Sequence, residues 1–362
     1  MNTYTIDYNS SPNPLIVAVG QGIDTVATSN DGINWVGRGT NFFGSGITIG
    51  YAVAWNGTRW VAVGQSTASS LNTIMYSNDG ITWIGVENST NIFSTQGLAV
   101  ASNGSSWVAL GYDRLTTPRY TIAYSSDGIV WTGLANSTNI FEAGRAVAWN
   151  GSLWVAVGQQ GGGNRYTIAY SSDGIVWTGV QNSRTIFSGN GGRGVAWNGS
   201  LWVASGEGTN SLAYSSDGIN WYGLGNSIIT KGLCIASNGS RWVAGGVNGN
   251  TMAYSNDGIN WTGLGTNFFA SNTSTCNGIA WTGVRWIATG TGSGGITDTM
   301  YYSRDGINWT GLGISILGGG GQAIGIRPFD TVSLTSANNS LDVVSDSYYQ
   351  NGYDNFVFSV KQ

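Results

Sequence analysis

The stretch Tyr170-Ser-Ser-Asp-Gly-Ile-Val-Trp-Thr-Gly179 decides the architecture of this chain, because its pattern recurs seven times. In every copy a Ser stands two residues before an Asp, a Gly follows the Asp, and a Trp comes four residues after it. The seven aspartates are Asp31, Asp79, Asp127, Asp173, Asp217, Asp257 and Asp305. Successive copies lie 40 to 48 residues apart. Such a period is typical of a repeat architecture.

One period reads as four short strands, which we label A to D in chain order. In the fourth copy these are residues 146–149, 154–157, 166–170 and 175–178. The Asn150-Gly151 pair between A and B is a strong hairpin signal, because both turn positions need a positive φ. Alternating β-branched and aromatic residues support all four strands. No window has a helical period, so we expect essentially no helix.

Four antiparallel strands, repeated seven times, predict a β-propeller. Strand A carries alternating small residues in every copy, such as Ala146 and Ala148, which suits inner strands crowded around an axis. A solenoid is the other candidate repeat fold, but it would have parallel strands, which hairpin turns exclude.

The two chain ends predict how the ring closes. The first copy begins at a strand B, Leu15 to Val19, and an extra strand A, Gln322 to Arg327, follows the seventh copy. We therefore predict an all-β, seven-bladed β-propeller of four-stranded antiparallel blades over residues 1–329, with the C-terminal strand closing the first blade. Residues 330–362 form a β-rich tail that packs on the propeller or contacts a partner. A degenerate eighth blade over residues 323–361 is the alternative.

The composition argues against several functional classes. Charged residues make up only 9% of the 362, with 14 Lys plus Arg, and there is no His. A chain without His lacks the usual general base and the commonest zinc ligand. Scattered basic residues do not suit binding to phosphate backbones, so no nucleic-acid partner is expected. We expect no cofactor and no metal, since calcium needs six or more oxygens and the seven aspartates lack neighbouring carboxylates.

Targeting and redox signals are sparse. The first ten residues have no basic region and no apolar run, so we expect no signal peptide. No stretch approaches the about 20 apolar residues of a membrane span, so no membrane insertion is expected. Cys234 and Cys276 precede the inner strands of neighbouring repeats. Buried free thiols are the simpler interpretation, and a single bridge is the other.

The motif Ser-x-Asp-Gly-x-x-Trp resembles the Asp-box, or bacterial neuraminidase repeat, although each copy is one residue shorter between Asp and Gly than that family's pattern. The resemblance implies a propeller in which each box is a structural turn between strands C and D. It also implies a wide choice of functions, from sialidases and lectins to assembly factors. The repeated segments Val-Ala-Trp-Asn-Gly-Ser and Tyr-Ser-Ser-Asp-Gly-Ile are similar to those of repeat proteins of large DNA viruses. This resemblance would suit a protein on the surface of a virion or particle.

The candidate site lies on the face made by the B–C and D–A loops, because the B–C loops vary most between copies. Residues at the start of strand A should rim the central channel. The candidate ligand-binding residues are Tyr51, Arg145, Arg193, Asn277 and Gln322 on that rim, with Tyr112, Asp113 and Glu207 in the B–C loops. Arg145 and Arg193 lie on adjacent blades and would hold a carboxylate or a polar ligand. The alternative is that they pair with Glu142 or with loop carbonyls.

The favoured function is non-enzymatic binding, most simply lectin-like binding of carbohydrate through this loop face, with a glycan or protein as the ligand. A structural or assembly role, as a virion surface or fibre subunit, is the first alternative. A glycoside hydrolase is the second, and it needs two cooperating carboxylates. The few candidates outside the boxes are Asp24, Asp113, Glu142, Glu207 and Asp298.

Overall fold

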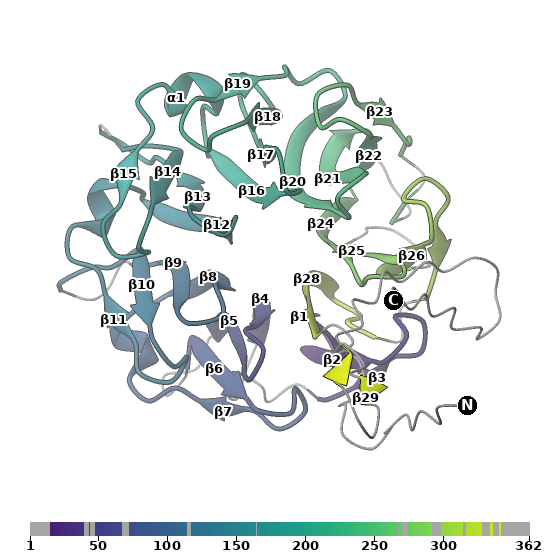
Figure 1. Ribbon diagram of the computed structural model, residues 1–362, viewed down its shortest axis with the longest axis horizontal. Helices are drawn as coiled ribbons and strands as arrows, with labels where there is room; N and C mark the ends of the chain where they lie inside the picture. Colours follow the sequence, from purple (N-terminus) through teal and green to yellow (C-terminus); the bar gives the residue numbers. More distant parts are fainter. Residues whose placement is uncertain are drawn as a thin grey trace.

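Seven four-stranded sheets are arranged in a ring around a central axis (Figure 1). The computed structural model describes residues 15–39, 43, 48–66, 72–113, 117–163, 165–266, 268–269, 274–291, 298–313 and 316–327, and the backbone of 334–335 and 340–341. Every blade is antiparallel, with its strands in the order A-B-C-D from the axis outward. The predicted seven-bladed propeller is therefore confirmed.

Each blade is a sheet of strands A, B, C and D, in that order. Blade 1 contains β28 (Gly320–Arg327), β1 (Leu15–Gln21), β2 (Val26–Ser29) and β3 (Val36–Gly37); blade 2 contains β4 (Thr48–Trp55), β5 (Trp60–Ser66), β6 (Ile74–Ser77) and β7 (Ile84–Gly85); blade 3 contains β8 (Gln96–Ser102), β9 (Trp107–Tyr112), β10 (Ile122–Ser125) and β11 (Thr132–Gly133). Blade 4 contains β12 (Ala143–Trp149), β13 (Trp154–Gln159), β14 (Ile168–Ser171) and β15 (Thr178–Gly179); blade 5 contains β16 (Gly192–Trp197), β17 (Trp202–Gly206), β18 (Leu212–Ser215) and β19 (Tyr222–Gly223). Blade 6 contains β20 (Ile229–Ser237), β21 (Trp242–Gly249), β22 (Met252–Ser255) and β23 (Thr262–Gly263); blade 7 contains β24 (Thr275–Trp281), β25 (Trp286–Thr291), β26 (Met300–Ser303) and β27 (Thr310–Gly311).

Blade 1 joins the two ends of the propeller, as predicted. Strand β28 pairs antiparallel with β1, with Leu15 opposite Arg327 and Val19 opposite Ala323. The last blade also packs on the first, because Ala18, Ile287 and Met300 share one buried cluster. The inner edge of blade 1 is thus supplied from the far end of the chain, and the ring of described blades is closed (Figure 1).

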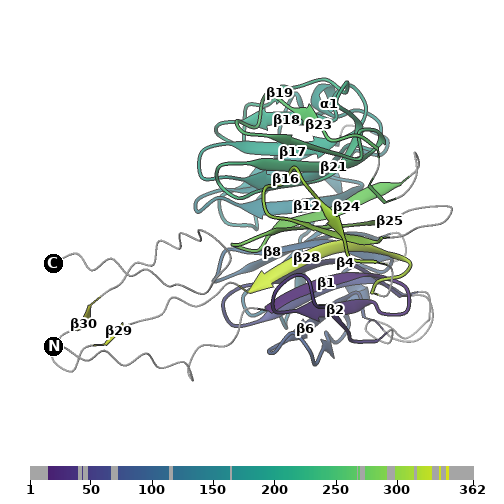
Figure 2. The same ribbon diagram turned by 90° about the vertical axis from the view of Figure 1, so that its right-hand side faces the viewer.

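The blades are held together by large apolar side chains between their sheets. The first residue of strand B is a fully buried Trp in six blades, namely Trp60, Trp107, Trp154, Trp202, Trp242 and Trp286. A phenylalanine in the D–A connection is also fully buried at five junctions, as Phe43, Phe93, Phe141, Phe187 and Phe269. Burying a side chain of this size contributes about 2 kcal/mol or more. The core is therefore seven clusters of buried side chains between the blades. Figure 2 shows the propeller edge on.

Three short helical segments depart from the expectation of essentially no helix. They are η1 (Ser89–Asn91), η2 (Ser137–Asn139) and α1 (Ser183–Ile186), all in D–A connections. Each begins at a serine whose hydroxyl accepts the backbone N–H at the start of strand C in its own blade, as Ser137 does from Thr121 at 3.0 Å. This tight turn directs the following phenylalanine into the core, and a single turn is too short to give a helical period in the sequence.

The predicted tail, residues 330–362, lies almost wholly outside the described residues. Its described backbone is an antiparallel pair, β29 (Leu334–Thr335) with β30 (Ser340–Leu341). Within the part of the chain that the structure describes, no helix is long and apolar enough to cross a membrane.

Candidate functional site

Each box forms a hydrogen-bonded turn around its aspartate. The Asp Oδ1 accepts the backbone N–H groups two and three residues on, at 2.7–2.9 Å, in all seven copies. The preceding serine hydroxyl donates to the same oxygen at 2.9–3.0 Å. Partial burial alone would raise the pKa of Asp217, but the bonds from Asn220, Ile219 and Ser215 outweigh it and lower the pKa to about 2. The box aspartates therefore hold turns and have their acceptor capacity largely occupied.

Each strand A carries a β-bulge at the end of the blade that lies opposite the box turns. The bulged residues are the predicted rim residues. The register shifts between Gly50 and Ala52, for example, which leaves Tyr51 unpaired. The same shift leaves one extra residue in each of the other six blades. The seven bulged residues are Tyr51, Leu98, Arg145, Arg193, Leu233, Asn277 and Gln322. We call these seven residues the mouth ring. Bulges re-aim side chains and are frequent beside binding sites.

Three residues of the mouth ring bond to a side chain near the end of strand B in their own blade, and in each pair the residues are 14 positions apart. Tyr51 Oη donates to Gln65 Oε1 at 3.1 Å, Arg145 Nη2 to Gln159 Oε1 at 3.0 Å, and Arg193 Nη2 to Glu207 Oε1 at 3.0 Å. In blades 2, 4 and 5 the repeat thus places a side-chain pair of different chemistry at the same end of the channel.

Further polar side chains link neighbouring blades at this end. Gln96 Nε2 donates to Gln65 Oε1 at 2.6 Å, and Gln159 Nε2 donates to Asn190 Oδ1 at 3.4 Å. Asn277 Nδ2 donates to the Gly321 carbonyl of blade 1 at 3.2 Å. The channel mouth is therefore built mainly of amides and charged groups, the side chains that bind hydroxyls and carboxylates.

Glu207 is shared between two cations. Its Oε1 accepts from Arg193 at 3.0 Å and its Oε2 from Lys231 Nζ, on blade 6, at 2.6 Å. The Glu207 side chain is only 13% exposed. Burial alone would raise its pKa, but the bonds from Lys231 and Arg193 outweigh burial and lower it. Glu207 is thus ionised and engaged at neutral pH.

Arg145 has a different environment from Arg193. Its Nη2 meets a neutral amide, and the Nε of both arginines is buried without a partner among the described residues. Burial, followed by the like charge of Arg193, lowers the pKa of Arg145 to about 10, while Glu207 and Tyr51 act in the opposite direction. Burial likewise raises the pKa of Tyr51, against the charge of Arg145. Arg145 remains a cation at neutral pH, and no carboxylate among the described residues is bonded to it.

The structure brings together four of the eight predicted ligand-binding residues: Tyr51, Arg145, Arg193 and Glu207. Asn277 and Gln322 belong to the mouth ring on blades 7 and 1. Tyr112 ends strand B of blade 3, opposite Gln96. Asp113 is buried within its loop, where it accepts from the Ser94 hydroxyl and from the Tyr120 backbone N–H at 3.4 Å.

The alternative partners predicted for the two arginines are not the ones found. Glu142 pairs with Arg165 at 2.8 Å, and Arg145 and Arg193 bond to the side chains of Gln159 and Glu207 rather than to loop carbonyls. The reason is geometric. The bulge turns the strand A side chain toward the end of strand B in its own blade, whereas Glu142 lies at the entry to β12 near the loop that contains Arg165.

The five carboxylates that could serve glycoside hydrolysis all have partners. Asp24 and Asp298 accept the backbone N–H groups of Gly39 and Gly313 at 2.7 and 2.6 Å, a role that Asn210 and Asn250 fill in blades 5 and 6. Asp113, Glu142 and Glu207 are bonded as described above. A general acid for glycoside hydrolysis needs a raised pKa, and the pKa of Glu207 is lowered.

Sequence reasoning missed Gln65, Gln96, Gln159, Asn190 and Lys231 at the channel mouth. The first and third had a detectable signal, because each stands 14 residues after a rim residue and directly after the glycine of strand B. Lys231 precedes its rim residue by two positions, and its contact with the neighbouring blade's Glu207 depends on how the blades pack.

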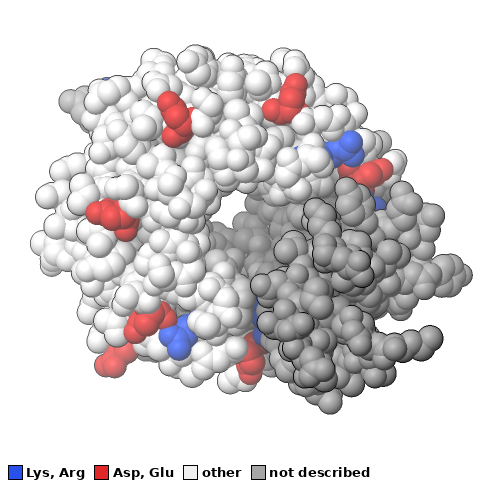
Figure 3. Space-filling model, viewed as in Figure 1, with Lys and Arg blue, Asp and Glu red and all other residues white. Residues whose placement is uncertain are grey.

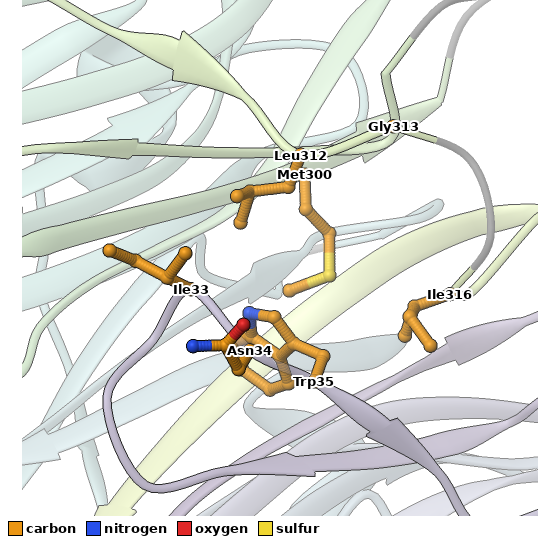
Figure 4. A pocket seen from close by; sticks show the side chains of 7 residues that line it. All are labelled: Ile33, Asn34, Trp35, Met300, Leu312, Gly313 and Ile316. Carbon is orange, nitrogen blue, oxygen red and sulfur yellow. The ribbon is translucent and has the colours of Figure 1, made fainter.

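A small cavity of about 130 Å³ lies at the seam between the first and last blades. Figure 4 shows Ile33 and Trp35 of blade 1 facing Met300 and Leu312 of blade 7 across it, with Ile316 at one side. Its lining side chains carry no titratable group, so it is a packing gap where the ring closes.

Cys234 and Cys276 are both buried free thiols, with their Sγ atoms 3.9 Å apart across the junction of blades 6 and 7. Burial, together with the contact with Cys234, raises the pKa of the Cys276 thiol well above its usual range. Among the described residues, no group of three or more Cys, Asp or Glu side chains is placed to hold a metal ion.

No family model matches the chain, and no curated protein matches it. Among solved structures, the chain is similar to YCF48 bound to a D1 peptide, with 16% identity, 85% of this chain and 86% of that chain covered, and a TM-score of 0.49. It is also similar to a nidogen/laminin complex, at 10% identity, 86% and 98% coverage and a TM-score of 0.48. A third is the computationally designed Ika8 protein, at 10% identity, 82% and 85% coverage and a TM-score of 0.49.

Proposed function

We propose that this protein is a non-enzymatic binding propeller that holds a carbohydrate ligand at the mouth ring. The observation that carries the proposal is the set of seven bulges, which directs one side chain per blade to the same end of the channel. Figure 3 shows an opening at the centre of the ring on the face opposite the mouth ring. A ligand at the mouth therefore meets several blades at once.

The chemistry of the mouth suits sugar hydroxyls. Tyr51, Gln65 and Gln96 form a bonded group of one hydroxyl and two amides, and Gln159 with Asn190 forms a second. Amides both donate and accept hydrogen bonds, which matches the hydroxyls of a saccharide. Because these side chains are fixed by bonds to one another, binding costs little side-chain entropy.

A glycan array with purified protein tests the proposal. We expect a group of related saccharides to bind, and Tyr51→Ala to weaken their binding about tenfold or more, since the variant removes a hydroxyl and a ring at the mouth. Thr58→Ala is the matched control, because Thr58 is exposed in the A–B turn at the other end of blade 2. Absence of binding to every saccharide, or equal loss in both variants, would contradict a carbohydrate site here.

A structural or assembly role has one observation in its favour. The box turns of blades 2, 3 and 4 expose apolar side chains, with Ile81 46%, Val130 70% and Val176 70% exposed. Such side chains on neighbouring blades suit contact with another protein. Ordered assemblies seen by electron microscopy, and lost in a double variant Val130→Ser and Val176→Ser, would support this second function.

A further inference from the structure

Two arginines at equivalent positions of adjacent blades have different partners. Arg193 bonds to the carboxylate of Glu207, and Arg145 bonds to the amide of Gln159, each 14 residues on and each at 3.0 Å. The two hydrogen bonds have the same length, but the partner of Arg193 is charged and the partner of Arg145 is neutral. Arg193 is neutralised within its own blade, whereas Arg145 is a partly buried cation facing a neutral group.

The charges around Arg145 add to this difference. Arg193 is the cation and Glu207 the carboxylate that act on Arg145, and Glu207 bonds to both Arg193 and Lys231. With Arg145 included, the described residues place three positive charges and one negative charge at this part of the mouth, in a chain whose net charge is -4. A local excess of positive charge in a partly desolvated concave site attracts an anion.

We propose that Arg145 binds a carboxylate group of the ligand, so that the mouth ring binds an acidic rather than a neutral saccharide. This inference rests on the proposed binding function and adds the chemical class. Gln159 holds Nη2 of Arg145 in place, and Nη1 has no bonded partner among the described residues, so it is available to bind a carboxylate. The planar end of a guanidinium matches a carboxylate better than it matches a single hydroxyl.

The surrounding groups orient the ligand. Tyr51 lies within electrostatic reach of Arg145, and its hydroxyl and the amide of Gln65 are available to the sugar ring beside the carboxylate. Glu207 opposes anions of higher charge on the other side of Arg145. The site is thus suited to a single carboxylate with neighbouring hydroxyls, as in a uronic acid.

The repeat itself supplies the test. Gln159→Glu copies the Glu207 arrangement into blade 4 and gives Arg145 a carboxylate partner of its own. Glu207→Gln is the reciprocal change and leaves Arg193 with an amide. Both changes preserve side-chain size, and thermal unfolding of each variant checks that the propeller stays folded.

Binding is followed by NMR of labelled arginine side chains during titration with acetate, glucuronate and glucose at constant ionic strength. We expect saturable shifts of the Arg145 signal with acetate and glucuronate but not with glucose, about tenfold weaker binding in Gln159→Glu, and tighter binding in Glu207→Gln. Unchanged affinity in folded Gln159→Glu, or acetate shifts no larger than those with chloride, would overturn the inference.

The outcomes separate this inference from the proposed function. If glucose and glucuronate bind equally, and Gln159→Glu binds as well as the natural sequence, sugar binding stands and carboxylate binding by Arg145 is refuted. Acetate binding at Arg145 without any saccharide binding would support carboxylate binding by Arg145 and refute the carbohydrate proposal.

Discussion

Gly32 in the first box packs against Ile287 in strand B of the last blade. A Cβ added to Gly32 would lie 2.7 Å from Ile287 Cδ1, and its φ of +75° is one that other residues rarely adopt. The same packing recurs between other neighbours, as Gly128 meets Val61. The junction that closes the ring is therefore built like the other junctions, although its two sides come from opposite ends of the chain.

Gly32→Ala should destabilise the propeller by about 2 kcal/mol or more, because it combines backbone strain with a steric contact at the closing seam. Gly39→Ala is the control, since Gly39 also has a positive φ, of +89°, but an added Cβ there meets nothing within 4 Å. It should cost only the strain, about 1 kcal/mol. Chemical denaturation measures both, and equal losses would show that the seam contact contributes nothing.

Val130→Asn should stabilise the protein by about 0.5 kcal/mol. Four boxes have an Asn three residues after the Asp, and its Nδ2 donates to Asp Oδ2 at 2.7–2.8 Å. Val130 occupies that position in blade 3 and is 70% exposed. Val36→Asn serves as the control, because Val36 is also exposed but lies in strand D rather than in the turn. A melting temperature raised equally by both changes would attribute the gain to lost apolar exposure.

Acid should destabilise the protein in a defined pH window. The pKa values of Asp31, Asp217 and Asp305 are about 2 in the folded chain, where hydrogen bonds outweigh burial, against about 3.9 when unfolded. A pKa lowered by folding means that the stabilisation is complete above about pH 4 and is lost as the pH falls toward 2. Melting temperatures measured from pH 7 to pH 2 should therefore be steady at first and fall below pH 4.

The same titration in Asp217→Asn should show a shallower fall, because one fewer carboxylate takes up a proton on unfolding. A melting temperature that falls mainly between pH 7 and pH 5 would place the responsible groups elsewhere.

Cys234 and Cys276 should not react with an aqueous thiol reagent in the folded protein. Both are buried, and burial keeps the Cys276 thiol protonated by raising its pKa, whereas the thiolate is the reactive form. Denaturation without reductant should release two reactive thiols per chain. Finding none would show that the two residues form a disulfide between blades 6 and 7.

Several features of the channel mouth were open to prediction. The rim residues followed from counting strand positions, because each stands at the same place in a repeated strand A, and the structure shows each one at a bulge. Gln159 and Glu207 stand 14 residues after Arg145 and Arg193, so the i to i+14 pairing was also within reach. The burial of Asp113 was not, since it depends on how one loop folds over Ser94 and Tyr120.

The sequence by itself determined the box turns and the order of the strands, and it favoured seven blades closed by β28 over a degenerate eighth blade. Each of these depends on local pattern or on repetition, whereas the bounds of the short strand D, such as Thr178–Gly179, came from the structure. Only the tertiary structure decided which charges meet. Lys231 of blade 6 reaches Glu207 of blade 5, while the described side-chain partner of Arg145 is an amide, because such contacts are set by the bulge, the strand register and the packing of neighbouring blades.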